Sequence, residues 1–234
     1  TKRTFTLLAI LLNCSLLISQ NTLIRKPAIS PDATKMAFGY HGDIWVYNFS
    51  TQQADRLTVH QAYESRPIWN SESSKLAFTS NRKGSTNIFT TLLKGGVPTQ
   101  LTHFPTTDVP SDWHANGDIL FTTNRMYKGP EWDPAIYSVH ETGATPQRFM
   151  TALGSQAVIS PNGNFVAFVK GACRIAREDY NGPAQRDVWI YNLKTKAYFQ
   201  ITTSKKNDHT PLWDANNNLY YVGAESGRYN IYKT

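Results

Sequence analysis

Cysteine is nearly absent from this sequence of 234 residues, in which only Cys14 and Cys173 occur. A fold held together by a framework of disulfides is therefore excluded. Charged residues are also few, at 18%, whereas hydrophobic residues make up 40% and aromatic residues 12%. That balance excludes a disordered tail and is sufficient for one sizeable all-β domain or two small ones.

No cluster of basic residues accompanies the positive net charge. The chain has 24 Lys and Arg against 17 Asp and Glu, a formal charge of +7. Lys2 and Arg3 lie near the amino terminus, the others are scattered, and the nearest approach to a cluster is Lys205 with Lys206. Surfaces that bind nucleic acid concentrate positive charge on one face. We therefore expect a solvated basic surface and no nucleic-acid partner.

The longest apolar stretch lies between residues 5 and 18, directly after Lys2 and Arg3. This order predicts a secretory signal peptide over residues 1–19, and hence a periplasmic or secreted protein. The stretch is short for a transmembrane helix, which needs about 20 apolar residues, so we expect no membrane span after leader removal. Asn13 stands where lipoprotein processing requires a small residue, which disfavours a lipid anchor on Cys14.

Internal repetition is the strongest signal in the sequence. Five units share a proline-containing or turn-forming entry, two short apolar strands and, in most units, an ending such as Leu-Thr. An aromatic residue recurs on the second strand of each unit at intervals of 40, 43, 47 and 53 residues. These residues are Phe38, Phe78, Phe121, Phe168 and Tyr221. A period of this length is typical of the four-stranded blades of a β-propeller.

The residue chemistry of the units supports an all-β propeller. Pro31 with Asp32 and Pro161 with Asn162 favour tight turns between the first two strands. Runs such as 44–47 and 188–191 are apolar on both faces, which is typical of sheets packed between two neighbouring sheets. The sequence predicts blades near residues 27–58, 66–102, 109–149, 156–202 and 208–234.

Three segments that enter the blades carry a family resemblance. They are Leu-Ile-Arg-Lys-Pro-Ala-Ile-Ser at 23–30, Ala-Tyr-Glu-Ser-Arg-Pro at 62–67 and Asp-Val-Pro-Ser-Asp-Trp at 108–113. The repeats resemble the WD-like propellers of the translocation protein TolB, of prolyl oligopeptidase relatives and of tricorn-type serine peptidases. The three segments favour the amino-terminal propeller of the tricorn type.

This resemblance implies a module without chemistry of its own. Tricorn-type peptidases carry a second propeller, a PDZ-like domain and a domain with a serine nucleophile after such a propeller, and none of these is in this sequence. The resemblance implies that the propeller filters or docks peptides for the peptidase. Expected partners are therefore peptides or protein domains, including downstream peptidase domains of the same chain.

No motif for catalysis or cofactor binding occurs in the sequence itself. A Gly-x-Ser-x-Gly elbow is missing, and Ser85 and Ser155, which follow glycines, are interpreted as turn residues. Histidines are spread along the chain without close spacing, and they are expected to be polar loop residues. They are His41, His60, His103, His114, His140 and His209. We assign no catalytic, cofactor or metal-binding residue.

Long connections between second and third strands suggest a binding face. The connection spans about 39–42 in the first unit, but about 124–134 in the third and 170–186 in the fourth. By the usual winding of a propeller, these connections share one face with the links between blades. The candidate residues for a peptide or partner on that face are Trp132, Arg174, Arg177, Tyr180 and Arg186. Ordinary surface loops packed against another domain are an equally good interpretation.

Two main functions follow from these observations. The first is an accessory propeller of a secreted tricorn-like serine peptidase, and the alternative is a stand-alone, TolB-like interaction propeller of the cell envelope. A third and weaker hypothesis is a propeller lyase for acidic sugars, because His60, His103 and His209 fall in corresponding loops. The coding sequence after Thr234 separates the first two.

The fifth unit ends at Thr234 within its third strand, so five units predict part of a six- or seven-bladed ring. An amino-terminal strand cannot close the ring if the first inner strand begins at Pro27, because only Lys26 separates it from Arg25. We therefore expect the first and fifth blades to expose apolar faces, and the 234-residue chain to self-associate.

Overall fold

A computed structural model describes residues 23–125 and 134–234. The predicted signal peptide at 1–19, Cys14 and the candidate residue Trp132 lie outside the described residues. Nineteen strands in five sheets make up the regular structure of the described residues. No helix that could cross a membrane occurs in this part of the chain. The predicted all-β propeller class is confirmed.

Four sheets have four strands and the fifth has three. Blade one contains β1 (Arg25–Ile29), β2 (Lys35–Tyr40), β3 (Asp43–Asn48) and β4 (Gln53–Arg56). Blade two contains β5 (Glu64–Trp69), β6 (Lys75–Lys83), β7 (Ser85–Leu92) and β8 (Thr99–Gln100). Blade three contains β9 (Asp108–Trp113), β10 (Asp118–Thr123), β11 (Ala135–His140) and β12 (Gln147–Leu153). Blade four contains β13 (Ser155–Ile159), β14 (Phe165–Lys170), β15 (Asp187–Asn192) and β16 (Tyr198–Gln200). Blade five contains β17 (His209–Trp213), β18 (Leu219–Gly223) and β19 (Asn230–Lys233).

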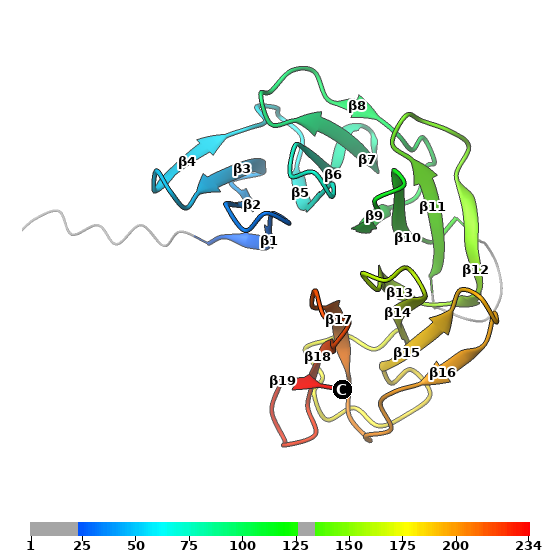
Figure 1. The fold of residues 1–234 in the computed structure, drawn as a ribbon. Coiled ribbons are helices and arrows are strands. Elements are labelled where there is room, and N and C mark those ends of the chain that lie inside the picture. Colours follow the sequence, from blue (N-terminus) through cyan, green and yellow to red (C-terminus); the bar gives the residue numbers. More distant parts are fainter. Residues whose placement is uncertain (1–22, 126–133) are drawn as a thin grey trace, which may run out of the picture.

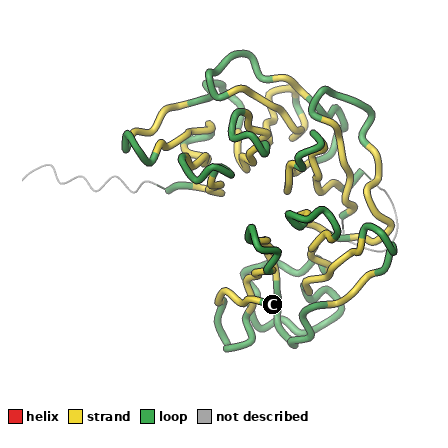
Figure 2. Tube along the Cα trace, in the orientation of Figure 1, coloured by secondary structure: helices red, strands yellow, loops and turns green. Residues whose placement is uncertain are grey.

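Every sheet is antiparallel, with its strands in chain order. The five sheets follow one another around an arc, and the first strand of each lies nearest the centre (Figure 1). Turns and loops connect the strands within each blade and from one blade to the next (Figure 2). The inner strands β1, β5, β9, β13 and β17 therefore surround a common axis.

One strand boundary corrects the sequence-based expectation. The first inner strand begins at Arg25, two residues before Pro27. Lys26, which we interpreted as a link, is a strand residue at a β-bulge, because the register shifts between Arg25 and Ala28. Its backbone φ of 49° is left-handed, a conformation that a lysine in the sequence gives no reason to expect.

The core lies between blades and repeats from one blade to the next. On the second strands of blades two, three and four, one residue packs against the following blade, and the residues before and after it, on the opposite face, pack against the preceding blade. Ala37 of β2 meets Leu76 and Phe78 of β6, and the same arrangement recurs at the next three junctions. Burying a side chain such as Phe78 contributes about 1.5–3 kcal/mol. This repeated packing explains the aromatic period seen in the sequence.

The Leu-Thr ending has a structural role that the sequence does not reveal. The hydroxyl of Thr58 accepts a hydrogen bond from the backbone N–H of Ile44 at 2.9 Å. Thr102 accepts from Ile88 at 3.0 Å in blade two, and Thr202 accepts from Val188 at 2.9 Å in blade four. Each threonine thus satisfies a buried donor of the third strand where the outer strand has ended.

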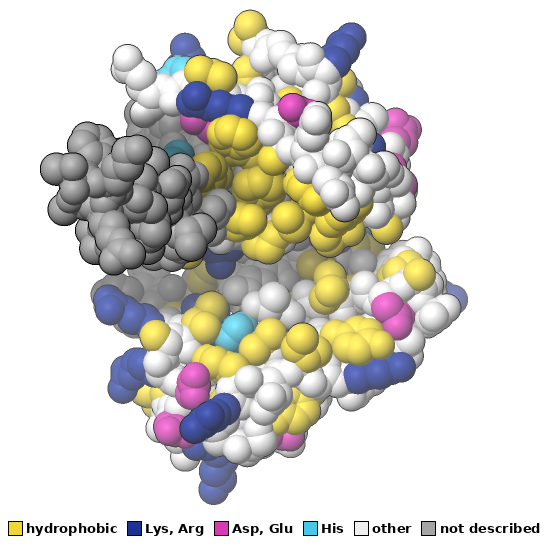
Figure 3. Space-filling view, turned by 90° about the vertical axis from the view of Figure 1, so that its left-hand side faces the viewer, with side chains coloured by type: hydrophobic (Ala, Val, Ile, Leu, Met, Phe, Trp, Pro, Cys, Tyr) yellow, Lys and Arg dark blue, Asp and Glu magenta, His cyan; other side chains and the backbone are white. Residues whose placement is uncertain are grey.

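The arc is open between blade one and blade five (Figure 1). Hydrophobic side chains gather on both sides of this gap when the molecule is viewed from its open side (Figure 3). Ile29 of blade one is 54% exposed, and Leu212 and Ile231 of blade five are 62% and 77% exposed. The end blades therefore present apolar surface, as the count of units predicts.

Candidate functional site

The connections between second and third strands lie on the same face as the links between blades. Glu64, which ends the first link, donates its N–H to the carbonyl of Gly42 in the β2–β3 turn at 2.8 Å. Asp208 makes the same kind of bond to the carbonyl of Arg186 at 2.8 Å, and Ser85 Oγ donates to the carbonyl of Phe104 at 2.9 Å. We call this surface the connection face.

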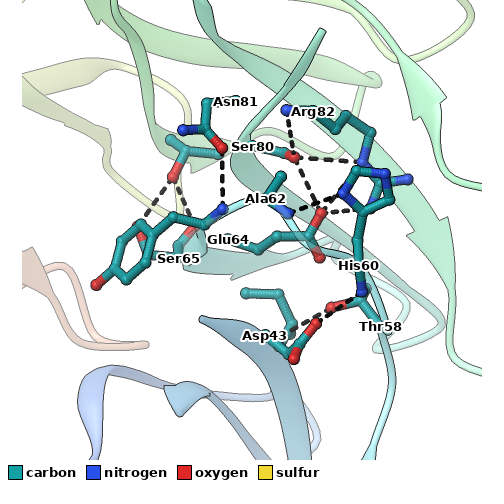
Figure 4. Close-up of polar contacts among 12 residues, drawn as sticks. Asp43, Thr58, His60, Ala62, Glu64, Ser65, Ser80, Asn81 and Arg82 are labelled. Carbon is teal, nitrogen blue, oxygen red and sulfur yellow. Dashed lines mark hydrogen bonds and ion pairs between the residues drawn. The ribbon is translucent and has the colours of Figure 1, made fainter. Parts of the chain in front are cut away.

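Buried acidic residues mark the points where inner strands begin on the connection face. Glu64 and Asp108 occupy equivalent positions, and each is almost fully buried. Arg82 pairs with Glu64, and Arg125 pairs with Asp108 at 2.6 Å. Ser80 also donates to Glu64 Oε1, at 2.9 Å (Figure 4). These carboxylates are neutralised by arginines of their own blades, so their arrangement indicates a structural role and not acid–base chemistry.

The first link is organised by Asp43. Its Oδ2 pairs with Arg56 at 2.5 Å, and its Oδ1 accepts from the N–H of His60 at 3.2 Å. His60 Nδ1 in turn accepts from the N–H of Ala62 at 2.9 Å (Figure 4). The imidazole thus stabilises the link itself.

A cleft of about 700 Å³ opens beside this link. Its walls come from the segment at 23–25, from the β2–β3 turn and from the link between blades one and two. The lining includes Arg25, Tyr40, His41 and Tyr63, and it ends at Glu64. A hollow lined by aromatic rings, imidazoles and one arginine can hold an extended peptide segment.

Blade five departs from the acid–arginine pattern. Asp208 takes the position of Glu64 and Asp108 and is fully buried. The residue that corresponds to Arg82 is Glu225, so no arginine of its own blade neutralises Asp208. Ser204 donates to Asp208 Oδ2 at 2.9 Å. Burial, and secondarily the charge of Glu225, raises the pKa of Asp208.

A second carboxyl with a raised pKa lies close to Asp208. Burial raises the pKa of Asp187, the first residue of β15, to about 6, and the charge of Asp208 adds to the shift. A hydrogen bond from Gln185 Nε2 at 3.1 Å opposes it. The boundary between blades four and five therefore holds two acids that ionise less readily than exposed carboxyls do.

The long β14–β15 connection brings three of the predicted candidate residues together. The N–H of Arg177 donates to the carbonyl of Arg174 at 3.0 Å, and that of Tyr180 donates to the carbonyl of Arg177 at 3.2 Å. The Arg177 guanidinium lies 4.7 Å from the centre of the Tyr180 ring. Arg174 and Arg177 are exposed, and Tyr180 is half-buried.

Arg186 lies apart from that group. It is half-buried at the end of the connection, and its Nε donates to the carbonyl of Cys173. Cys173 is a buried free thiol. Arg186 therefore helps to close the base of the connection, a packing role that its position in the sequence does not indicate. Trp132 lies outside the described residues.

A family model shows to which protein family the chain belongs. The model for the tricorn protease N-terminal β-propeller domain matches residues 21–234. The chain belongs to this family. No curated protein sequence matches it.

Solved structures show where else the fold of this tricorn-type propeller occurs. The crystal structure of the tricorn protease is 13% identical with a TM-score of 0.78, and the match covers 91% of this chain and 21% of that chain. TolB from Acinetobacter baumannii is 18% identical with a TM-score of 0.73, covering 91% and 52%. The propeller domain of the Trilobed protease from Pyrococcus furiosus is 18% identical with a TM-score of 0.64, covering 90% and 66%. At these identities the likeness concerns the fold.

Residues that sequence reasoning missed hold the long connection of the tricorn-type propeller in place. Tyr229 of blade five donates its hydroxyl to the carbonyl of Ile175 at 2.5 Å. Asn207 Nδ2 donates to the carbonyl of Arg177, and Lys206 pairs with Asp179. These residues lie 27–54 positions from their partners in the sequence, and no local sequence pattern indicates such contacts.

Metal chemistry finds no support in residues 23–125 and 134–234. No three His, Cys, Asp or Glu side chains come together there in a way that could hold a metal ion. His60 is used within its link, whereas His209 is buried and contacts the ring of Tyr229 edge to face at 4.9 Å. The two histidines thus have separate local surroundings.

Proposed function

We propose that this chain is the amino-terminal propeller module of an exported tricorn-like serine peptidase, where it acts in peptide access or domain docking. The family match supports the tricorn-like parent. The observation that carries the role is the anchored connection at 171–186, which presents Arg174 and Arg177 from the connection face. A loop of this length inside a compact blade usually serves binding.

The chemistry of that connection suits acidic or carboxylate-bearing partners. Guanidinium groups form charge-assisted hydrogen bonds with carboxylates, and arginine and tyrosine are enriched in protein interfaces. Tyr180 stacks beneath Arg177, and the contacts of Tyr229 and Asn207 with the loop backbone fix its course. A held loop loses less conformational entropy on binding than a free one does.

A substitution experiment in the full-length protein tests the role. Replacing Arg174 and Arg177 together by Ala should weaken binding of acidic peptides, or crosslinking to the peptidase domain, by about tenfold because two charge-assisted contacts are lost. The melting temperature should stay unchanged because both side chains are exposed. Lys94→Ala with Lys194→Ala is the matched control, since these exposed lysines lie in turns on the opposite face. Unchanged binding to every peptide and domain tested would refute the role.

A stand-alone, TolB-like interaction propeller is the second candidate. The TM-score of 0.73 with TolB from Acinetobacter baumannii over 91% of this chain favours it as far as fold can. The two candidates differ in the coding sequence after Thr234. A peptidase domain encoded there supports the first, and a stop codon supports the second. Mass spectrometry of the mature amino terminus tests the proposed export, for which we expect loss of about residues 1–19.

A further inference from the structure

Every inner strand of the propeller carries a β-bulge on the side of the axis. The register shifts within β1, β5, β13 and β17 at the same position of each strand, and β9 has a shift of its own. The bulged residues Lys26, Arg66, Gln156 and Thr210 have left-handed φ values of 49°, 54°, 56° and 55°. Bulges re-aim a side chain and are frequent next to functional sites.

On blades four and five the bulged residues are hydrogen-bonded, Thr210 to Gln156 and Gln156 to blade three. The N–H of Thr210 donates to Gln156 Oε1 at 2.8 Å, and the N–H of Gln156 donates to Thr122 Oγ1 at 3.3 Å. On blade three, Ser111 Oγ donates to the carbonyl of Ala157 at 2.8 Å. The polar groups on this part of the axis are therefore uncharged and hydrogen-bonded to one another.

Blades one and two contribute two cations instead. Lys26 and Arg66 are exposed, and neither side chain makes a hydrogen bond or an ion pair with another described residue. The pKa of Lys26 is lowered, first by partial desolvation and then by the charge of Arg66. Two like charges thus lie near each other on neighbouring inner strands.

His209 on blade five lies within range of the charge of Lys26. It is 7% exposed, its Nδ1 lies 2.7 Å from Thr210 Oγ1, and its Nε2 has no partner among the described residues. Burial lowers its pKa to about 4, helped by the charges of Arg186 and Lys26. Tyr229 covers the ring edge, and the preceding residue, Asp208, belongs to the same cluster. If Thr210 donates to Nδ1, Nε2 carries the proton and can donate to an acceptor.

We propose that Lys26, Arg66 and His209 form a carboxylate-binding site on the axis of the propeller. A carboxylate placed there would relieve the repulsion between Lys26 and Arg66 and offset the effect of the Lys26 charge on the imidazole of His209. The cleft beside the first link is lined by Arg25 and Glu64, which stand one and two residues from the two cations in the chain. That the carboxylate belongs to a peptide, as its terminus or as an acidic side chain, rests on the proposed function in peptide handling.

Calorimetry on the full-length protein with three acetylated tetrapeptides tests the site. The first peptide has neutral side chains and a free terminal carboxylate, the second has a terminal amide and one central Asp, and the third has the amide and Asn. We expect at least one carboxylate peptide to bind about tenfold or more tightly than the third, reflecting a charge-assisted contact. The tighter of the first two identifies the source.

Substitutions locate the binding. Lys26→Gln with Arg66→Gln should remove the preference for carboxylate, whereas the matched control Lys94→Gln with Lys194→Gln should keep it. If all three peptides bind equally and the axial variant changes nothing, peptides are handled elsewhere and the axial site is wrong, while the proposed function stands.

A second readout decides the case in which no peptide binds and the proposed peptide role fails. Acetate, added at constant ionic strength with chloride as the reference, should shift the imidazole NMR resonances of His209. The shift should vanish in the Lys26→Gln, Arg66→Gln variant. Such a shift supports a carboxylate site, and its absence in the unmodified protein overturns the proposal.

Discussion

At the residue scale, the threonines that follow the outer strands are specific and testable contributors to stability. Thr102 is fully buried, and its hydroxyl both accepts from Ile88 N–H and lies 3.2 Å from Asn87 Oδ1. Thr102→Val keeps the shape but leaves the amide without an acceptor, so we expect a loss of about 1–3 kcal/mol in the free energy of unfolding. Urea denaturation measures it, with exposed Thr107→Val as the control. Equal midpoints for the two variants would contradict this role.

The raised pKa of Asp187 predicts a pH dependence. The folded-state value of about 6 exceeds the usual 3.8, so the folded protein binds more protons in that window. The contribution of Asp187 to stability is therefore present below about pH 4 and is lost as the pH rises through 6. His209 has the opposite sign, because its pKa falls from 6.5 to about 4 and its contribution is lost as the pH falls through that range.

A variant isolates the first of these effects. The stability of Asp187→Asn relative to the unmodified protein should increase between pH 4 and pH 7, because the amide cannot ionise. Urea midpoints at four pH values give the difference, with Asp55→Asn on the exposed outer strand β4 as the baseline. A difference that does not change with pH would contradict the assigned shift.

At the element scale, the strands of neighbouring blades are joined by hydrogen bonds from tryptophans. Trp69 Nε1 of β5 donates to the carbonyl of Ala28 in β1 at 2.9 Å, and Trp213 of β17 donates to Val158 in β13 at 3.2 Å. These bonds cross a blade boundary, in addition to the apolar packing. They tie each of these inner strands to the preceding one.

Trp69→Phe keeps an aromatic ring but removes the donor. We expect a loss of about 0.5–1.5 kcal/mol in unfolding free energy. Amide exchange should become faster in blade one and stay unchanged in blade four, because the lost bond is local. Trp113→Phe is the matched control, since Trp113 makes no such bond with the described residues. An equal change in amide exchange across all blades would contradict a local role of this hydrogen bond.

The repeat made the strands predictable, but not the bulges within them. Pro31 with Asp32 signals a turn because proline presets its backbone, and Ile44 to Tyr47 signals a strand because both faces are apolar. A left-handed φ occurs at Lys26, Arg66 and Thr210. These residue types give no reason to expect that conformation. The sequence therefore did not reveal that these residues lie at bulges of the inner strands.

The same limit applies to the connection face. Its location followed from the winding of a propeller, and the length of the β14–β15 connection could be read directly. Which of its arginines would be exposed could not be read, because Arg186 is held by a backbone carbonyl of Cys173 thirteen residues earlier. Contacts from Tyr229 and Asn207 depend on how blade five packs against blade four.

At the scale of the whole molecule, the arc formed by residues 23–125 and 134–234 gives each of its two end blades only one neighbouring blade. Blade one has Met36 where the other blades place Leu76, Ile119, Val166 and Leu219 against a preceding blade. Blade five has Tyr220 where Ala37 and its equivalents contact a following blade. The strand β19 also has no outer neighbour among the described residues. Apolar faces and an unpaired edge of this kind promote association.

Light scattering on residues 20–234 tests the open propeller most directly. We expect concentration-dependent self-association, because the gap exposes Leu212 and Ile231 on blade five and Ile29 on blade one. Leu212→Lys with Ile231→Lys should reduce it by charging one side of the gap, whereas Val97→Lys, at an exposed turn elsewhere, should not. A monodisperse, cooperatively melting monomer of the unmodified residues 20–234 would contradict the account.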